Sequence, residues 1–455
     1  MSKPATIAAL PDDEIPALAY TGFGKLPHAA ALMLRVIDAA AARVSLGQWA
    51  EDGLTFGAHR GTVRPVLQCA LSACGLRALN VSEALLAGLA TPFLEGMDTP
   101  HRRRALGDEA ENAPEHWEWS DRSAHAVVLA YAADVAALET LLAGFDTRLA
   151  GWRLERCLRL PPLPGHREHF GFRDGISQPW VPGLHAAGSD EDCIPPGEVL
   201  LGHANAFGEI SPPGTSCDGA VGRHGSYLVL RQLGQDVAEF WRGLLAQVEG
   251  DAEAAVMLAA KAMGRWPDGR PLDGSPDGLR TALRFATDPH GLVCPLGAHV
   301  RRANPRDSLL ADSALSLVQM RSHRLLRRGR AFGAPLAADW LPTEARLLPH
   351  GTASNADTTS ETAPRGMLFA ALCANPAAQF ELVQQTWLNN PKHNGQRDEV
   401  DPIAAGRKLV ADTRRFSVPE FPFRRRLHNM ANAVRVLGGG YFLLPGRSGL
   451  RALLR

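Results

Sequence analysis

One carboxylate stands between two glycines in the segment Gly171-Phe172-Arg173-Asp174-Gly175. Glycine permits positive φ and a close approach of the backbone to another group. Phe172 and Ile176 would give Asp174 apolar neighbours, and desolvation raises the pKa of a carboxyl group, which suits it to proton transfer. The alternative is a turn in which Asp174 caps its own backbone, and the local pattern alone favours that turn.

A single histidine is followed by three arginines between Cys294 and Arg306, in Cys-Pro-Leu-Gly-Ala-His-Val-Arg-Arg-Ala-Asn-Pro-Arg. A lone histidine is more often structural than a ligand. Arginine, however, pairs bidentately with carboxylates such as the two haem propionates, and a neutral imidazole is a common ligand of haem iron. His299 is therefore a candidate metal ligand.

A third segment, His323–Gly333, is dense in arginine around Leu325 and Leu326. It could be a plain basic loop. It could also hold one guanidinium over a reactive centre as a fixed positive charge.

Segments typical of strands are followed by segments with helical periodicity at three places along the chain. The strand-like runs lie at 124–132, 226–231 and 367–373, and the helical ones at 135–143, 235–248 and 376–387. Asp134 is a suitable N-cap for the first helix, and Pro376 stands at the permitted start of the third. The repetition predicts two similar α+β halves, with a hinge within 185–225.

Two further segments carry less regular patterns. The apolar periodicity of Ala29 to Ala42 predicts a helix near the N-terminus. Near the C-terminus, 433–437 and 441–444 are strand-like, and the glycines at 438–440 between them predict a tight turn or a bulge.

Composition limits the classes of partner. The 455 residues include 48 Lys plus Arg and 48 Asp plus Glu, so no net charge would attract nucleic acid or an anionic membrane. The clusters Arg102–Arg104 and Arg424–Arg426 are short enough to be solvated faces or ion-pair networks. No run approaches the ~18 apolar residues that span a bilayer. No secretory segment is visible, and seven cysteines without Cys-x-x-Cys argue against disulfides and structural zinc, so a cytoplasmic location is expected.

Together the three segments resemble those of the dye-decolourising peroxidase family, a group of haem peroxidases. Gly171–Gly175 is similar to the Gly-x-x-Asp-Gly signature, Gly297–Arg306 to the proximal-histidine segment and Leu325–Gly333 to the distal-arginine segment. Further similar segments are 365–369, 379–390 and 439–445, all in the family's order. The resemblance covers about residues 120–450.

The resemblance implies an α+β fold of two ferredoxin-like halves, 1–205 with an irregular N-terminal extension and 206–455, each an antiparallel sheet with packed helices. It implies one haem b per chain, held mainly by the C-terminal half. Asp174 would be the acid/base, Arg327 the distal arginine and His299 the iron ligand. The cofactor-binding residues it implies are Gly175, Ile176, Ser177, Asn304, Pro305, Arg306, Arg327, Phe332 and, more loosely, Glu381 as the carboxylate behind His299, with Asp398, Glu399 and Asp401 as alternatives.

The implied activity is reduction of hydrogen peroxide with oxidation of dyes, phenols or other aromatic donors through a ferryl intermediate. No nucleic acid or membrane is expected as a partner, and a homo-oligomer stays open. The rival interpretation is a non-catalytic haem-binding or iron-release protein of the same fold, which would keep His299 and Arg306 without needing Asp174. Chlorite decomposition is a second rival, because a fold does not fix a function.

Overall fold

The computed structural model describes residues 10–59, 63–210, 221–274, 283–334, 364–406 and 414–454. Within these ranges ten strands form one continuous sheet, and two more form a separate hairpin. The strands are β1 (His28–Val36), β2 (Val66–Leu71), β3 (Trp119–Ser120), β4 (Ala126–Ala132), β5 (Trp152–Leu160), β6 (Ser226–Gln235), β7 (Leu326–Arg327), β8 (Arg330–Phe332), β9 (Gly366–Cys373), β10 (Phe416–Val418), β11 (Arg425–Leu427) and β12 (Val434–Leu444).

The long sheet consists of two quartets with the same strand order. Neighbouring strands run β5-β1-β4-β2 and then β12-β6-β9-β7. Numbered by chain order within each quartet, both are 4-1-3-2, and the pairs within each quartet are antiparallel, which is the ferredoxin-like arrangement. The prediction of two ferredoxin-like halves is confirmed, whereas the division at residue 205 stays a prediction.

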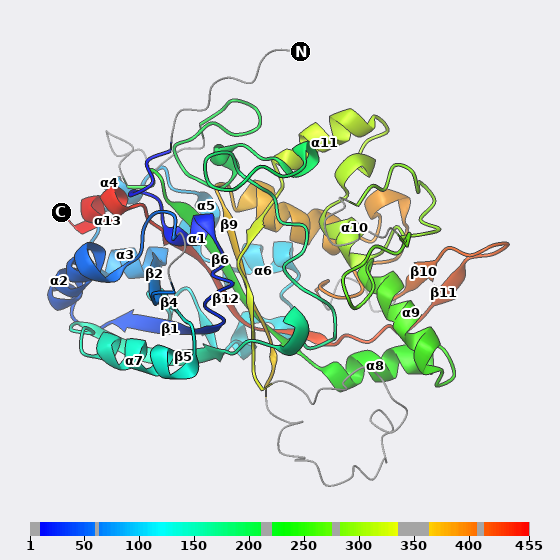
Figure 1. Ribbon diagram of the computed structural model, residues 1–455, viewed down its shortest axis with the longest axis horizontal. Helices are drawn as coiled ribbons and strands as arrows, with labels where there is room; N and C mark the ends of the chain where they lie inside the picture. The colour runs from blue at the N-terminus through cyan, green and yellow to red at the C-terminus, as the bar shows by residue number, and fades with distance from the viewer. Residues whose placement is uncertain are drawn as a thin grey trace, which may run out of the picture.

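Helices cover the sheet unevenly, as Figure 1 shows. Helices α2, α3, α7 and α13 lie beside the N-terminal quartet, and α8 to α11 lie beyond the C-terminal one. The bounds are α1 (Ala17–Tyr20), α2 (Ala39–Gln48), α3 (Ala73–Ala78), α4 (Glu83–Leu86), α5 (Thr91–Glu95), α6 (Pro100–Leu106), α7 (Val135–Asp146), α8 (Val237–Ala246), α9 (Ala252–Met263), α10 (His299–Ala303), α11 (Ser313–Arg321) and α13 (Arg447–Leu454), with π-helical turns η8 (Ala377–Glu381) and η9 (Val383–Leu388).

Two of the predicted helices begin at an aspartate cap. Asp134 accepts a hydrogen bond from the backbone N–H of Ala137 at the start of α7, and Asp236 does the same for Glu239 at the start of α8. The third predicted helix exists but winds as the π-helical η8 and η9.

The helix predicted for Ala29 to Ala42 is wrong. Residues 28–36 form β1, and a helix begins only at Ala39, after Asp38 caps it. Alanine and leucine favour helices intrinsically, but β1 is hydrogen-bonded to β4 on one edge and β5 on the other. Burial of both of its faces outweighs that weak preference.

The two faces of the sheet bury separate cores. One core contains Leu32, Leu34, Val229 and Tyr441 and packs against the helices, including Leu46 of α2. The other contains the side chains that point the opposite way, such as those of Leu228 and Phe442, and is closed by α1 with its flanking residues at 15–26 and by the chain at 181–200. Side chains alternate along a strand, so neighbouring residues of one strand serve different cores.

Strand β12 joins the two halves without the predicted tight turn. It runs unbroken from Val434 to Leu444, with a register shift between Val436 and Gly438, so the predicted bulge is present. A Cβ at Gly438 would stand 2.6 Å from the indole nitrogen of Trp119, and one at Gly440 would stand 2.6 Å from Cβ of Asp121. Because these glycines have no side chains, Trp119 and Asp121 of the N-terminal half can pack directly on the backbone of β12.

A third, smaller core lies beside the C-terminal quartet. Helices α8 and α9 pack there with Phe170 and Phe172, and the ring of Phe170 stacks on that of Phe240 with centroids 4.3 Å apart. The segment that carries Asp174 is thus fixed by aromatic packing on its N-terminal side.

The absence of membrane-spanning helices and of disulfides, both expected from the sequence, can be compared with the described residues. Among the described residues, no helix has the length and apolar character needed to cross a bilayer. The six described cysteines are all free thiols, as the prediction of no disulfide framework expects.

Candidate active site

The loop that carries Asp174 is held in place by a buried carboxylate. Glu168 accepts hydrogen bonds from the backbone N–H groups of Phe170 (3.0 Å) and Phe172 (2.9 Å) and from the side chain of Gln235 (2.5 Å). Burial raises the pKa of Glu168 to about 7, the three hydrogen bonds oppose that rise, and the charge of Asp174 adds to it. Gly171 has φ of +113°, a value that favours glycine.

Asp174 faces Arg327. A distance of 3.8 Å separates Oδ1 of Asp174 from Nη1 of Arg327. The Arg327 side chain also donates to the backbone carbonyl of Ile176 (2.8 Å), and its own backbone N–H donates to Gln178 Oε1 (3.1 Å). The side chain of Asp174 is 39% exposed, so the described protein atoms do not provide the apolar enclosure that the sequence suggested.

His299 begins α10 and is oriented by Asp401. Its Nδ1 donates to the two carboxylate oxygens of Asp401 at 3.0 and 3.1 Å. Burial lowers the pKa of His299, but the charge and hydrogen bond of Asp401 outweigh it and raise the pKa overall. The charges of Arg327 and Asp174 also act on His299, so the three predicted residues surround one region.

The other ring nitrogen of His299, Nε2, is available to bind a metal. The imidazole is 26% exposed while the carboxylate of Asp401 is fully buried, and the described residues offer Nε2 no hydrogen-bond partner. A histidine whose Nδ1–H is held by a carboxylate presents a neutral, basic Nε2, which is the usual state of an axial metal ligand.

The carboxylate hydrogen-bonded to His299 is that of Asp401, one of the alternatives, and not that of Glu381. Glu381 accepts hydrogen bonds from Tyr441 and Arg102. Asp398 pairs with Arg415, and Glu399 is bound to Ser417. Sequence could not separate these carboxylates because the π-helical turns η8 and η9 set which of them faces α10.

Buried arginines fix the segment around His299. Arg302 donates to the backbone carbonyls of Trp387 (2.6 Å) and Glu399 (2.5 Å), which ties α10 to the segment that carries Asp401. Arg301 donates to the carbonyls of Cys294 (2.8 Å) and Asp288 (2.9 Å). The two arginines thus align the imidazole with its acceptor.

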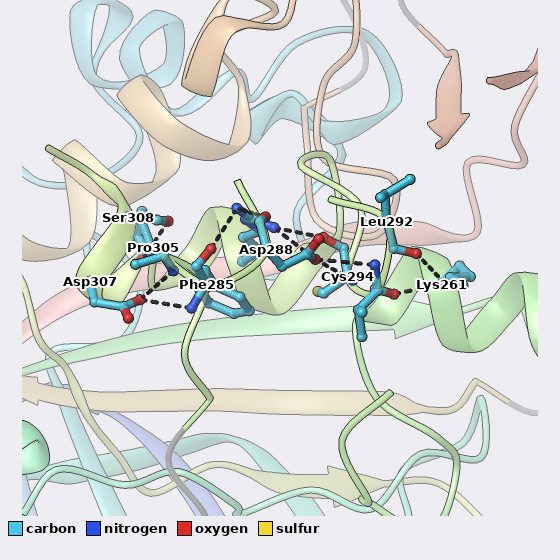
Figure 2. Close-up of polar contacts among 11 residues, drawn as sticks. Lys261, Phe285, Asp288, Leu292, Cys294, Pro305, Asp307 and Ser308 are labelled. Atoms are coloured by element: carbon cyan, nitrogen blue, oxygen red, sulfur yellow. Dashed lines mark hydrogen bonds and ion pairs between the residues drawn. The ribbon is translucent and has the colours of Figure 1, made fainter. Parts of the chain in front are cut away.

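The chain before His299 is held by side-chain bonds to backbone, shown in Figure 2. Asp288 accepts from the N–H groups of Val293 and Cys294, and Asp307 accepts from that of Phe285. Lys261 donates to the carbonyls of Leu292 and Val293. An irregular segment therefore has a fixed path without belonging to the sheet.

A cluster of arginines lies next to the site. Arg306 and Arg324 both ion-pair with Asp192, at 3.2 and 2.8 Å. Arg265 is 5% exposed, donates to Ser177 Oγ at 2.9 Å and is close enough to Arg306 and Arg327 for their charges to lower its pKa, which burial lowers first, to about 10. Because Arg306 and Arg324 share one carboxylate, this pair carries an excess of buried positive charge.

Most of the predicted cofactor-binding residues meet in this region. Ile176 and Ser177 contact Arg327 and Arg265 respectively, and Gly175 precedes them with φ of +76°. Asn304, Pro305 and Arg306 end the α10 segment, and the buried Oδ1 of Asn304 has no partner among the described atoms.

Phe332, also predicted to bind the cofactor, lies on the opposite face of the sheet from Arg327. Its side chain, 2% exposed, belongs to the core on the other face of the sheet. It pairs with Gly366 in β9, whereas Arg327 pairs with Ala371, so the two side chains point to opposite faces. The partners of Phe332 and Arg327 in β9 are separated by an odd number of positions. This pairing could not be read from the sequence alone.

Sequence analysis missed several residues of this region. Met367 and Phe369 alternate with the core residues Leu368 and Ala370, so they share the face of Ala371 and Arg327 and are half-buried there. Asp192, Arg265 and Arg324 were not singled out either. The dense arginines of 323–333 were a signal for Arg324, whereas nothing local marked Asp192 or Arg265.

The region fits a flat dianionic metallocofactor such as haem. His299 offers one nitrogen ligand, and the arginine cluster offers charge for two carboxylates. Among the described residues, no group of three or more His, Cys, Asp or Glu side chains could hold a metal ion by itself. A single histidine as the protein ligand is the pattern of haem proteins.

Comparison with known proteins gives a consistent result. The chain is 28% identical over 418 residues to the dye-decolorizing peroxidase msp1 of Mycetinis scorodonius, across 85% of this chain and 75% of that protein. It is 28% identical over 352 residues to a dye-decolorizing peroxidase of Exidia glandulosa, across 71% of this chain and 62% of that one. No family model matches the chain.

Solved structures support the fold. An ancestral D-type dye-decolorizing peroxidase superimposes with a TM-score of 0.81 at 23% identity, over 98% of this chain and all of that one. This likeness shows the fold, which consists of two ferredoxin-like lobes. The sequence relatives are named dye-decolorizing peroxidases, and the similarity to them, which extends over most of this chain, supports a peroxidase of that type.

Proposed function

We propose that this chain binds one haem b between His299 and the Asp174/Arg327 pair, reduces hydrogen peroxide there and oxidises dyes, phenols or other aromatic donors. The observation that carries the proposal is the pairing of Asp174 with Arg327 at 3.8 Å in a region where both charges act on His299. A haem carrier needs the histidine and a carboxylate-binding arginine but has no use for this acid–cation pair.

Haem would be held from one side by Nε2 of His299 and at its propionates by Arg306, with Arg265 and Arg324 adding positive charge. When bound, haem supplies the electrons that cleavage of the peroxide O–O bond requires and later recovers them from donors.

Asp174 moves the proton. As a carboxylate it accepts the proton of one oxygen of hydrogen peroxide at Oδ1 and delivers it to the other oxygen, which leaves as water. Such acid–base help is typically worth 10²–10⁴-fold in rate. The partial exposure of the Asp174 side chain leaves room for peroxide to reach it.

Arg327 supplies fixed positive charge. Its side-chain bond to the carbonyl of Ile176 holds the guanidinium beside Asp174 before peroxide arrives, and the bond from its backbone N–H to Gln178 fixes the strand that carries it. Negative charge builds up on the departing oxygen as the O–O bond breaks, and a preorganised donor stabilises it. Loss of one such donor costs about 10²–10³-fold by comparison with oxyanion sites.

The test is peroxide-dependent oxidation of a dye by the haem-loaded protein, with Asp174→Asn as the variant. We expect Asp174→Asn to keep its Soret band and to lose about 10²–10⁴-fold in kcat/KM for peroxide. Asp146→Asn, at the exposed end of α7, is the matched control and should behave as the wild type.

Two outcomes would contradict the proposal. A wild-type protein that takes up haem but oxidises no donor with peroxide would favour the haem-carrier alternative. An Asp174→Asn variant with undiminished kcat/KM would remove Asp174 from the reaction.

A further inference from the structure

A buried phenol in the helix-covered core is bonded to a carboxylate. Tyr441 of β12 is 0% exposed, and its hydroxyl donates to Glu381 Oε1 at 2.7 Å. Its backbone N–H donates to Asp121, and the charges of Arg231 and Asp121 also reach it. Burial and the neighbouring Glu381 raise the pKa of Tyr441 well above its ordinary value.

Glu381 is suited to receive the proton of this phenol. Its second oxygen accepts from Arg102 at 2.6 Å, and Arg102 also pairs with Glu95 at 2.9 Å. Burial raises the pKa of Glu381, against the effects of Tyr441 and Arg102, which makes the carboxylate a better base. If Glu381 becomes protonated, Arg102 keeps Glu95 as its counter-ion, so no buried charge is left unpaired.

The same bonds lead to the surface. Glu95 is also bonded to His101 Nε2 at 2.8 Å, and the exposed fraction of the side chains rises from 7% at Glu381 through 15% at Arg102 to 50% at His101. The site of the phenol is therefore connected to solvent by polar groups, although the phenol itself touches no solvent.

Tyr441 lies in one cross-strand row with Arg327. Arg327 is paired with Ala371 of β9, Ala371 with Val229 of β6, and Val229 with Tyr441 of β12. Directly paired residues share a face, and three strand spacings of about 4.8 Å put the two backbones about 14 Å apart. Phe369, on the same face, is linked to Tyr441 by ring contacts through Phe380, with centroid distances of 6.0 and 6.3 Å.

Two other buried tyrosines lack this arrangement. The hydroxyl of Tyr227 accepts from the backbone N–H of Ala90, and the ring of Tyr131 lies 5.2 Å from the guanidinium of Arg330. A donor at the oxygen and a cation at the ring both disfavour loss of an electron and a proton. Tyr227 is on the same face as Tyr441, two residues along the paired strands, so it is a natural control.

We infer that Tyr441 is a proton-coupled redox relay residue, with Glu381 as its proton acceptor. The inference rests on the proposed function, because the oxidant is the peroxide-oxidised haem site. Tyr441 gives one electron to that site and its phenolic proton to Glu381, and so becomes a neutral phenoxyl radical beside a carboxylic acid. An electron from a donor, with return of the proton from Glu381, restores both groups. Being buried, Tyr441 stores one oxidising equivalent away from the pocket and does not touch donors.

The experiment is freeze-quench electron paramagnetic resonance of the haem-loaded protein, mixed with one equivalent of hydrogen peroxide and no donor. We expect a neutral tyrosyl radical whose spectrum narrows when the protein contains ring-deuterated tyrosine. Tyr441→Phe should abolish that signal, and Tyr227→Phe should leave it unchanged. Glu381→Gln keeps Tyr441 but removes the base, so the radical should form about 10²-fold more slowly or not at all.

The outcomes separate this inference from the proposed function. If peroxide is consumed and a tyrosyl radical persists in Tyr441→Phe, the relay assignment is wrong while the peroxidase proposal stands. A radical that forms at the wild-type rate in Glu381→Gln would refute the proton acceptor. A wild-type protein that does not react with peroxide would refute the proposed function, and the relay with it.

Discussion

Replacing Asp401 by asparagine removes the negative charge and one of the two acceptors behind His299, and leaves the size of the side chain unchanged. Oδ1 of Asp401 accepts from His299 Nδ1 (3.1 Å) and from the backbone N–H groups of Ile403 (2.9 Å) and Ala404 (2.7 Å), whereas Oδ2 accepts from His299 alone. An asparagine whose carbonyl takes the place of Oδ1 keeps all three donors. The negative charge behind the imidazole is lost, and the amide NH2 group replaces the second acceptor, Oδ2, opposite Nδ1–H of His299.

The magnitude follows from that geometry. A hydrogen bond to a charged group contributes about 1.5–3 kcal/mol and a neutral one about 0.5–1.5 kcal/mol. The difference of about 1.4 kcal/mol corresponds to roughly tenfold weaker haem binding, at the low end of the 10–100-fold known for partners of metal-bound histidine. Asp401→Ala should lose more, because the N–H groups of Ile403 and Ala404 also lose their acceptor.

The assay is titration of the haem-free protein with haem, followed at the Soret band, together with the reduction potential of the loaded protein. Asp401→Asn should bind haem about tenfold more weakly and have a higher potential, because a less basic imidazole stabilises ferric iron less. Asp398→Asn is the matched control, since Asp398 pairs with Arg415 away from His299. Unchanged affinity and potential in Asp401→Asn would refute the role of Asp401.

Two further predictions concern stability. Asp108 and Arg231 form a bidentate pair at 2.5 and 2.7 Å with side chains 1% and 6% exposed, so Asp108→Asn should lower the free energy of unfolding in urea by about 3–5 kcal/mol, and a loss below 1 kcal/mol would contradict this. Burial raises the pKa of Asp121 to about 7 from an ordinary 3.8. Between these two pH values the folded state keeps a proton that the unfolded state has released. The stability contributed by Asp121 should therefore fall by on the order of 4 kcal/mol as pH rises from 4 to 7. Asp121→Asn should flatten that part of the pH profile of unfolding, and an unaltered slope would show that Asp121 titrates normally.

The catalytic side chains were more predictable from sequence than their surroundings. Asp174, His299 and Arg327 each lie in a short segment with unusual residue types, and the structure brings all three to one region. Their assigned roles remain proposals. Asp401, by contrast, is 102 residues from His299, and its approach depends on how η9 and the segment after it pass behind α10.

The fold class was predictable because strand and helix patterns repeat, whereas β1 was not. Its alanine-rich sequence carries a helical periodicity, and only pairing with β4 and β5, which are distant along the chain, makes it a strand. The face on which Phe332 lies was unpredictable for a related reason, because it depends on the partner of Phe332 in β9. The predicted cytoplasmic location remains a prediction.

The glycines of β12 make the two halves of this chain dependent on each other. Trp119, Met97 and Asp121 of the N-terminal half occupy the space where side chains at 438, 439 and 440 would stand, and Asp108 neutralises Arg231 from the same side. Fragments cut after residue 205 would each be incomplete: one would present a glycine-lined trough with an unpaired guanidinium, the other the side chains that fill it. Such a pair would work as a split reporter, because Asp174 comes from one fragment and Arg327 and His299 come from the other, so the proposed peroxide site is complete only when the two fragments meet.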